Sequence, residues 1–116
     1  MTVASSAPAP AEALRVSVRR PRAGTVVVEV CGALDLATAP RLDELLTSRL
    51  RSAVTVLILD LSGVTSLRSA GVGVLVRARL LAQQRGVALR VAAGASRPAA
   101  QALDAAGLTA PLSAAV

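Results

Sequence analysis

The sequence contains no aromatic residue, no histidine and only one cysteine among its 116 residues. Without aromatic rings the chain lacks the side chains that stack on nucleic-acid bases and that anchor many ligand pockets and interfaces. Without histidine it lacks the base of Ser-His and Cys-His nucleophile pairs and a common zinc ligand. These absences argue against an enzyme, and we expect no catalytic residue, no metal site and no cofactor.

The single cysteine, Cys31, has no second cysteine with which to form an internal disulfide, which fits a reducing compartment. No stretch of the sequence approaches the roughly 18 apolar residues that a membrane span requires. Residues 1–13 lack the basic and long apolar regions of a signal peptide, so we expect them to be a disordered lead. The prediction is therefore a cytoplasmic protein without a membrane span, in which residues 14–116 form a single domain.

Lysine is also absent, so the 13 basic residues are all arginine, and the net charge is +6. Apart from a group at positions 15, 19, 20 and 22, the arginines are scattered along the sequence. Because a basic stripe is the usual mark of a nucleic-acid surface, we expect no nucleic-acid partner. Hydrophobic residues make up 53% of the chain, far more than in disordered segments, so a packed core can form.

The first periodic segments have the spacing of strands. Residues 14–19 alternate apolar with polar side chains, which predicts a half-exposed strand at a sheet edge. Residues 21–24 contain proline and glycine and predict a turn. Residues 25–31 are apolar and mostly β-branched, which predicts a second, more deeply buried strand that is antiparallel to the first.

The period then changes to that of a helix. Thr38 is expected to cap this helix, which presents one apolar face formed by Leu42, Leu45, Leu46 and Leu50. Residues 53–59 form a continuous apolar run, which is typical of an interior strand covered on both faces. We expect that strand to end at Asp60.

A second helix is predicted to begin within residues 66–71 and to end near Gln84, with Gly86 as its C-cap. Its core-facing stripe consists of Val74, Leu75, Ala78, Leu81 and Ala82. Residues 87–92 are expected to form the last strand, and Ser96 to cap a final helix that Gly107 ends; residues 112–116 form an unassigned tail. The resulting order, ββαβαβα, predicts an α/β fold with a mixed, largely parallel sheet flanked by helices.

Loops at the carboxyl ends of parallel strands are where such sheets place their sites, and here they hold Asp35 and residues 60–71. Asp35 and Asp60 would act as an acid/base couple only if the fold brought them together. Gly71 and Gly73 lack the third glycine of a dinucleotide fingerprint, and no P-loop is present. A small enzyme or nucleotide-binding protein is therefore the weaker hypothesis.

Ser69 lies at a predicted helix start, where a serine ordinarily caps the helix. The same place favours anions, because free N–H groups and the helix dipole would stabilise a phosphate by about 0.3–2 kcal/mol. Ser69 is thus either a cap or a phosphorylation site. A separate stripe on this helix, apolar near Ser69 and polar further along, suits a protein partner and consists of Val72, Val76, Arg79 and Gln83.

Four segments together resemble the STAS domain family, and more narrowly the bacterial anti-sigma factor antagonists. They are residues 32–40 (GALDLATAP), 59–64 (LDLSGV), 67–73 (LRSAGVG) and 106–108 (AGL). The resemblance implies a STAS fold and a partner switch. The unphosphorylated antagonist would bind an anti-sigma factor with serine kinase activity, and phosphorylation of one serine by that kinase would end the binding.

In this resemblance Ser69 takes the place of the phosphoacceptor, and Asp60 that of an aspartate at the end of the third strand. The implied partner-binding residues, together with the stripe on the helix, are Asp35, Arg68, Ser69, Ala70, Gly71, Val72, Val76 and Arg79. Arg68 stands where the family usually has an acid. It would either pair with the phosphate or remove a group on which the kinase relies. The rival within the same fold is a STAS scaffold or a transporter-associated subunit, in which Ser69 is only a cap.

Overall fold

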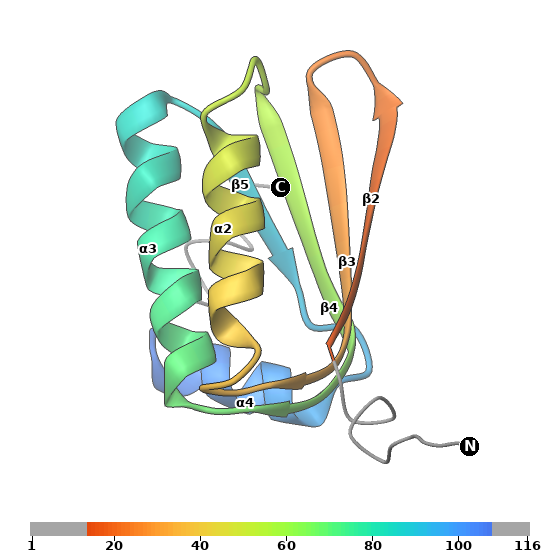
Figure 1. The fold of residues 1–116 in the computed structure, drawn as a ribbon, viewed down its shortest axis with the longest axis vertical. Coiled ribbons are helices and arrows are strands. Elements are labelled where there is room, and N and C mark those ends of the chain that lie inside the picture. Colours follow the sequence, from red (N-terminus) through yellow and green to blue (C-terminus); the bar gives the residue numbers. More distant parts are fainter. Residues whose placement is uncertain (1–13, 108–116) are drawn as a thin grey trace, which may run out of the picture.

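The computed structural model describes residues 14–107 and contains four strands and three helices in the order ββαβαβα, as predicted (Figure 1). They are β2 (Arg15–Arg22), β3 (Thr25–Leu34), α2 (Ala39–Leu50), β4 (Val56–Leu67), α3 (Ser69–Arg85), β5 (Ala88–Ala92) and α4 (Arg97–Ala105). The predicted disordered lead (residues 1–13) and the unassigned tail (residues 112–116) lie outside the described residues.

The strands form one mixed sheet in the order β2-β3-β4-β5. β2 pairs with β3 antiparallel, whereas β3, β4 and β5 are parallel to one another. As expected, β2 is an edge strand. Charged side chains on an edge strand discourage pairing with other chains, and β2 carries several arginines.

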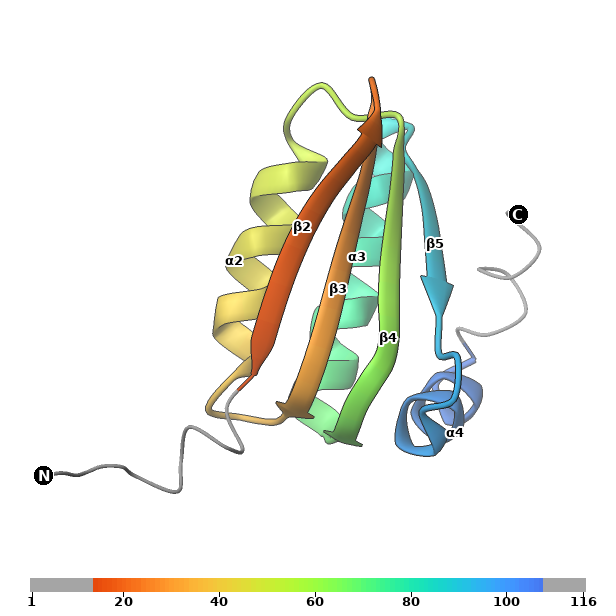
Figure 2. The same ribbon diagram turned by 90° about the vertical axis from the view of Figure 1, so that its right-hand side faces the viewer.

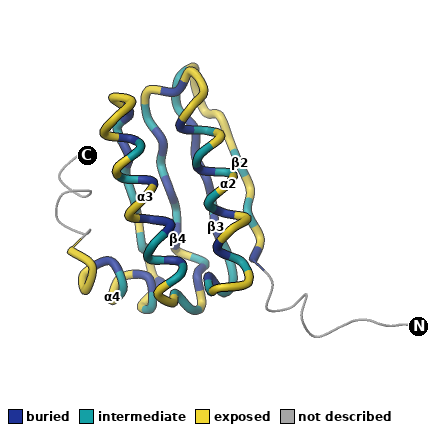
Figure 3. The backbone as a smooth tube through the Cα atoms, turned by 60° about the vertical axis from the view of Figure 1, so that its left-hand side comes forward, coloured by how far each residue is buried: buried dark blue, intermediate teal, exposed yellow. Residues whose placement is uncertain are grey.

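The core lies between the sheet and two helices, α2 and α3, which pack side by side on one of its faces (Figure 1). Figure 3 shows the buried side of each helix turned toward the sheet. The buried positions on the helices include Leu42, Leu46, Leu50, Val74, Leu75, Ala78 and Ala82. They meet alternate residues of the central strands, among them Val28, Val30, Leu57, Leu59 and Leu61. Each large aliphatic side chain buried in this way contributes about 1.5–3 kcal/mol to stability.

On the opposite face of the sheet lies α4, which packs against the carboxyl-terminal part of β4 (Figure 2). Val56 and Ile58 point to this face and are half-buried, whereas their neighbours Leu57 and Leu59 are fully buried. The sequence predicted a strand covered on both faces; among the described residues, Leu57 and Leu59 on one face are fully covered and Val56 and Ile58 on the other are covered in part. An apolar run marks an interior strand, and β4 is one because it lies between β3 and β5.

β4 does not end at Asp60, as the sequence predicted, but continues to Leu67. It continues because β3 also extends, to Leu34, and the two strands stay paired along their added length. Gly63 lies opposite Cys31 in this extension, and a Cβ at Gly63 would be only 2.5 Å from the Cys31 Sγ atom. A residue without a side chain therefore lets the strands run on. Their carboxyl ends lie beside the first turn of α3.

The capping of α2 also differs from the prediction. Thr38 occupies the N-cap position, but its side chain accepts no capping hydrogen bond from the helix. Its hydroxyl donates instead to the Ala33 carbonyl (2.8 Å) and accepts from the Asp35 N–H (3.0 Å). Thr38 thus stabilises the loop before the helix rather than the helix itself.

The caps of the later helices follow the prediction. Gly86 ends α3 in the left-handed conformation, at φ 69°, which glycine adopts without strain. Ser96 caps α4 by accepting a hydrogen bond from the Ala99 N–H, and its hydroxyl donates to the Val64 carbonyl at 2.6 Å. Ser96 is buried, so this pair of bonds fixes the start of α4 against β4.

Candidate functional site

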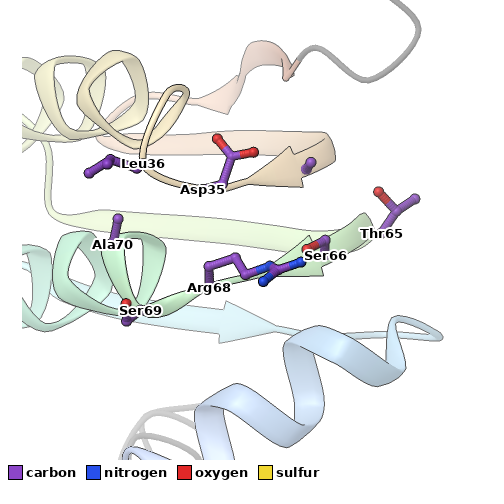
Figure 4. A pocket seen from close by; sticks show the side chains of 8 residues that line it. Asp35, Leu36, Thr65, Ser66, Arg68, Ser69 and Ala70 are labelled. Carbon is purple, nitrogen blue, oxygen red and sulfur yellow. The ribbon is translucent and has the colours of Figure 1, made fainter. Parts of the chain in front are cut away.

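A hollow of about 640 Å³ opens where β3 and β4 end and α3 begins (Figure 4). One wall comes from the end of β3 and the loop after it, and the other from the end of β4 and the first turn of α3. The lining residues are Ala33, Asp35, Leu36, Thr65, Ser66, Arg68, Ser69 and Ala70. The structure thus brings together Asp35, Arg68, Ser69 and Ala70, four of the residues that the sequence singled out.

Asp35 holds the loop between β3 and α2 in shape. Its Oδ1 atom accepts hydrogen bonds from the backbone N–H groups of Ala37 (3.0 Å) and Thr38 (3.1 Å). Its backbone carbonyl accepts from the N–H of Ala39, the first residue of α2, at 2.8 Å. Removing the carboxylate would leave the Ala37 N–H without its acceptor and the Thr38 N–H with only the Asp35 carbonyl, so Asp35 has a structural role whatever else it contacts.

Leu36 is the most prominent apolar side chain of the site, because 82% of it is exposed. It lies between the first hollow and a second one of about 520 Å³, which extends between the starts of α2 and α3. Sequence reasoning missed Leu36, since a lone leucine in a loop belongs to no periodic pattern. The only available signal was its place between two residues that shape the loop, Asp35 and Thr38.

Ser69 is the first residue of α3, is exposed, and lines both hollows. The hypothesis that its side chain caps the helix was wrong: the N-cap position belongs to Arg68, and no side chain caps this end. Because the first N–H groups of a helix have no helical acceptor, the start of α3 is electropositive and presents backbone N–H donors.

Arg68 is fixed through its backbone and free in its side chain. Its N–H donates to the Leu34 carbonyl at 3.0 Å, and its carbonyl accepts from the Val72 N–H at 3.0 Å. Its side chain is exposed and forms no ion pair within residues 14–107, even though Asp35 lines the same hollow. A guanidinium that the fold does not use is therefore available to an anion at the rim of the hollow.

Gly71 is buried, and a Cβ there would be 2.7 Å from the Leu34 Cγ atom and 3.2 Å from its carbonyl oxygen. This close approach brings the start of α3 against the end of β3. A part for Gly71 in partner binding stays a prediction, and it would act by placing Ser69 rather than by contact.

The predicted stripe along α3 is partly exposed. Val76 is 37% exposed, whereas Val72 and Arg79 are half-buried. Leu80, one turn beyond Val76 and 53% exposed, is a further apolar residue on this helix that the sequence analysis had not assigned. A partner that covered Ser69 and extended along α3 would meet Val76 and Leu80 in turn.

Asp60 is not part of the hollow. It lies within β4, in register with Glu29 of β3, and its Oδ1 atom accepts a hydrogen bond from the Ser62 N–H at 2.9 Å. Asp35 and Asp60 therefore do not form the acid/base couple that an enzyme would need at this site. Within residues 14–107 no three potential metal-binding side chains of histidine, cysteine or acidic type lie together, and no helix there is long and apolar enough to cross a membrane.

The family model of the STAS domain matches residues 17–112. The chain belongs to the STAS domain family. No curated protein matches the sequence.

Solved structures share this fold. An anti-sigma factor antagonist from Mycobacterium paratuberculosis superposes on the STAS domain with a TM-score of 0.73 and 24% identity, over 94% of this chain and 88% of that one. The phosphorylated form of the Bacillus cell fate determinant SpoIIAA gives a TM-score of 0.70 and 18% identity, over 84% and 87%. The STAS domain of an antisigma-factor antagonist from Rhodobacter sphaeroides gives 0.59 and 19%, over 74% and 95%.

Proposed function

We propose that this STAS domain is an anti-sigma factor antagonist that binds an anti-sigma factor with serine kinase activity and is regulated by phosphorylation of Ser69. The observation that carries the proposal is the position of Ser69, exposed at the start of α3, without a capping role and at the rim of two hollows. The fold supports it, since the solved structures that it resembles include anti-sigma factor antagonists, one of them in a phosphorylated form.

Phosphorylation of Ser69 would have a large effect on the binding of a partner protein. A phosphate at Ser69 would add a charge of about −1.5 to −2 beside Leu36, which is the exposed apolar residue of the site. A partner that buries Leu36 would have to bury that charge as well, and burying an unpaired charge is costly. The free N–H groups at the start of α3 would meanwhile stabilise the phosphate in the unbound protein.

Arg68 strengthens this second effect. Its side chain has no ion-pair partner within the described residues and extends toward Ser66 (Figure 4), so after a change of rotamer it could form a charge-assisted hydrogen bond to the phosphate. Of the two roles that the sequence left open for Arg68, we propose stabilisation of the phosphorylated form. An arginine at this position would therefore prolong the modified state.

The rival hypotheses lose support at this site. A scaffold or transporter-associated STAS domain in which Ser69 only caps α3 does not explain a serine that makes no capping bond. A small enzyme would need a pair of reactive groups, and Asp35 and Asp60 do not share the hollow. We accordingly infer that the protein acts by binding and has no catalytic activity of its own.

The first test is capture of the partner from a native extract with the tagged full chain as wild type, Ser69→Ala and Ser69→Asp. Wild type and Ser69→Ala should retain the anti-sigma factor, and Ser69→Asp should bind it at least tenfold more weakly, which corresponds to about 1.4 kcal/mol. Ser48→Asp on α2 is the matched control, because it adds the same charge at another exposed serine. Equal binding by Ser69→Asp and Ser48→Asp would reject Ser69 as the switch.

The second test locates the phosphate. After incubation of the wild type with the captured kinase and ATP, mass spectrometry should find the modification on Ser69. A phosphate found only on Thr65 or Ser66, which line the same hollow, would overturn the assignment. Arg68→Asp should lose the phosphate faster than the wild type when a serine phosphatase is added. If the kinase modified Arg68→Asp much faster than the wild type, Arg68 would instead be a brake on phosphorylation.

The third test maps the contact surface with two exposed leucines. Leu36→Ser should weaken binding of the captured anti-sigma factor without lowering the melting temperature, because the side chain is mostly exposed. Leu80→Ser makes the same chemical change further along α3. A loss in the Leu36 variant alone confines the interface to the Ser69 end, whereas a loss in both extends it along α3. No loss in either would refute this surface.

A further inference from the structure

The end of the molecule opposite Ser69 carries a concentration of arginine. Three chain reversals meet there: the turn between β2 and β3, the segment from α2 to β4, and the junction of α3 and β5 (Figures 1 and 2). We call this surface the arginine pole and define it by Arg20, Arg22, Arg49, Arg51 and Arg85. These residues are scattered in the sequence, and only the fold assembles them.

Backbone contacts hold the three reversals together. The Gly24 carbonyl in the first accepts hydrogen bonds from the N–H groups of Thr55 (2.8 Å) and Val56 (3.0 Å), where the second reversal joins β4. The Arg85 side chain in the third donates from Nε to the Leu50 carbonyl at 2.9 Å. A cavity of about 310 Å³ is lined by residues of the first two reversals together, including Arg20, Arg22 and Ser52. The arginine pole is therefore one surface rather than three separate ones.

The charge of the arginine pole is not compensated within residues 14–107. None of its five arginines forms an ion pair there, and no described aspartate or glutamate lies in the three reversals. Arg85 has a structural role, since it donates to carbonyls at the end of α2, and Arg49 offsets the negative end of the same helix. Arg20, Arg22 and Arg51 are exposed and have no such role.

We propose that the arginine pole docks on the surface of an anionic phospholipid bilayer. The guanidinium group suits phosphate, and an array spread over three reversals at one end of the molecule matches a plane of headgroups. A protein interface would need an apolar centre, yet the exposed large hydrophobic residues, Leu36, Val76 and Leu80, lie outside the pole. Nucleic acid is less suited, because the chain has no aromatic side chain that could stack on bases.

Docking through this surface would leave the partner site accessible. The carboxyl ends of β3 and β4, with Ser69 beside them, lie at the other end of the molecule (Figure 1). The protein could then meet an anti-sigma factor while it is held at a membrane. The inference does not depend on that function, since vesicle binding is measured without any partner.

The test is sedimentation of the full chain with vesicles of phosphatidylglycerol and phosphatidylcholine. Binding should require phosphatidylglycerol and should weaken as salt is raised, because exposed charges are screened. Each arginine near an anionic bilayer contributes about fivefold to partitioning, so the double variant Arg20→Gln/Arg22→Gln should bind roughly 25-fold more weakly. Both side chains are exposed and form no ion pair with any residue that the structure describes, so the fold should tolerate their replacement.

The matched control is Arg15→Gln/Arg97→Gln, which removes the same charge from exposed arginines outside the arginine pole. It should bind vesicles nearly as well as the wild type. Equal losses in the two double variants would mean that only net charge matters, and the proposal would fail. It would also fail if the wild type did not bind these vesicles, or if duplex DNA at the same phosphate concentration removed it from them.

Discussion

Two glycines in the first turns of α3 offer a direct test of how the site is built. A Cβ at Gly71 would lie 2.7 Å from the Leu34 Cγ atom and 2.9 Å from its Cδ2 atom, whereas at Gly73 the nearest atom is the Arg77 Nη1 atom, at 3.8 Å. Leu34 is fully buried and has no room to withdraw. Gly71→Ala should therefore force the start of α3 away from β3, and Gly73→Ala should be accommodated without displacement.

The pair separates the clash from helix propensity. Replacing glycine by alanine inside a helix gains up to about 1 kcal/mol, and both variants share this gain. Overpacking a core costs about 1–3 kcal/mol, and only Gly71→Ala incurs it. We expect Gly73→Ala to be more stable than the wild type and Gly71→Ala to be less stable than Gly73→Ala by about 1–3 kcal/mol.

Urea unfolding should be followed by far-ultraviolet circular dichroism, because the chain has no tryptophan or tyrosine whose fluorescence would report it. For a domain of this size the expected difference corresponds to several degrees in melting temperature. The Gly71→Ala variant should also bind the anti-sigma factor more weakly, since Ser69 moves with the helix start. Equal stabilities of the two alanine variants would refute the close packing of α3 on Leu34.

Three further predictions concern single residues. Leu75→Ala, at a buried core position of α3, should lower the free energy of unfolding by about 2–5 kcal/mol in urea denaturation, and a loss below half a kcal/mol would contradict the helix register. Ser96→Ala should cost about 1–3 kcal/mol in the same assay, because it leaves both the Val64 carbonyl and the Ala99 N–H without a partner. Arg79→Glu should weaken anti-sigma factor binding in titration calorimetry at an unchanged melting temperature, and unchanged affinity would place the interface elsewhere on the domain.

Periodicity predicted the elements whose residues face one core. The leucines of α2 and the stripe of α3 recur at helical spacing. The residues at the centre of each of these two faces are buried, including Leu42, Leu46 and Leu75. The turn-forming residues were equally informative, because the conformation of Gly86 and the capping hydrogen bond from the Ala99 N–H to Ser96 depend on local chemistry. Such features need no knowledge of distant contacts, which is why a single sequence predicts them.

The errors arose where a neighbouring segment decided the outcome. Asp60 looks like the end of a strand, but β4 continues because the extended part of β3 remains paired with it and Gly63 fits against Cys31. Thr38 has the right identity for a cap, but its hydroxyl is taken by the loop that Asp35 organises. Both outcomes depend on contacts between segments, which a residue's type and spacing do not determine.

The backbone and the side chain of Arg68 have different roles. The fold uses its backbone, whose N–H and carbonyl join the end of β3 to the first turn of α3, and its exposed side chain forms no hydrogen bond or ion pair within residues 14–107. Exchanging an acid for an arginine next to Ser69 therefore leaves the architecture unchanged and alters charge alone. Opposite unit charges attract by about 1 kcal/mol at 4 Å in water, so beside a phosphate the exchange shifts the balance by a few kcal/mol before salt screening. With Ser69 as the proposed phosphoacceptor, the sign of that shift would favour the phosphorylated state, and the domain should then lose its phosphate more slowly than one with an acid at that position.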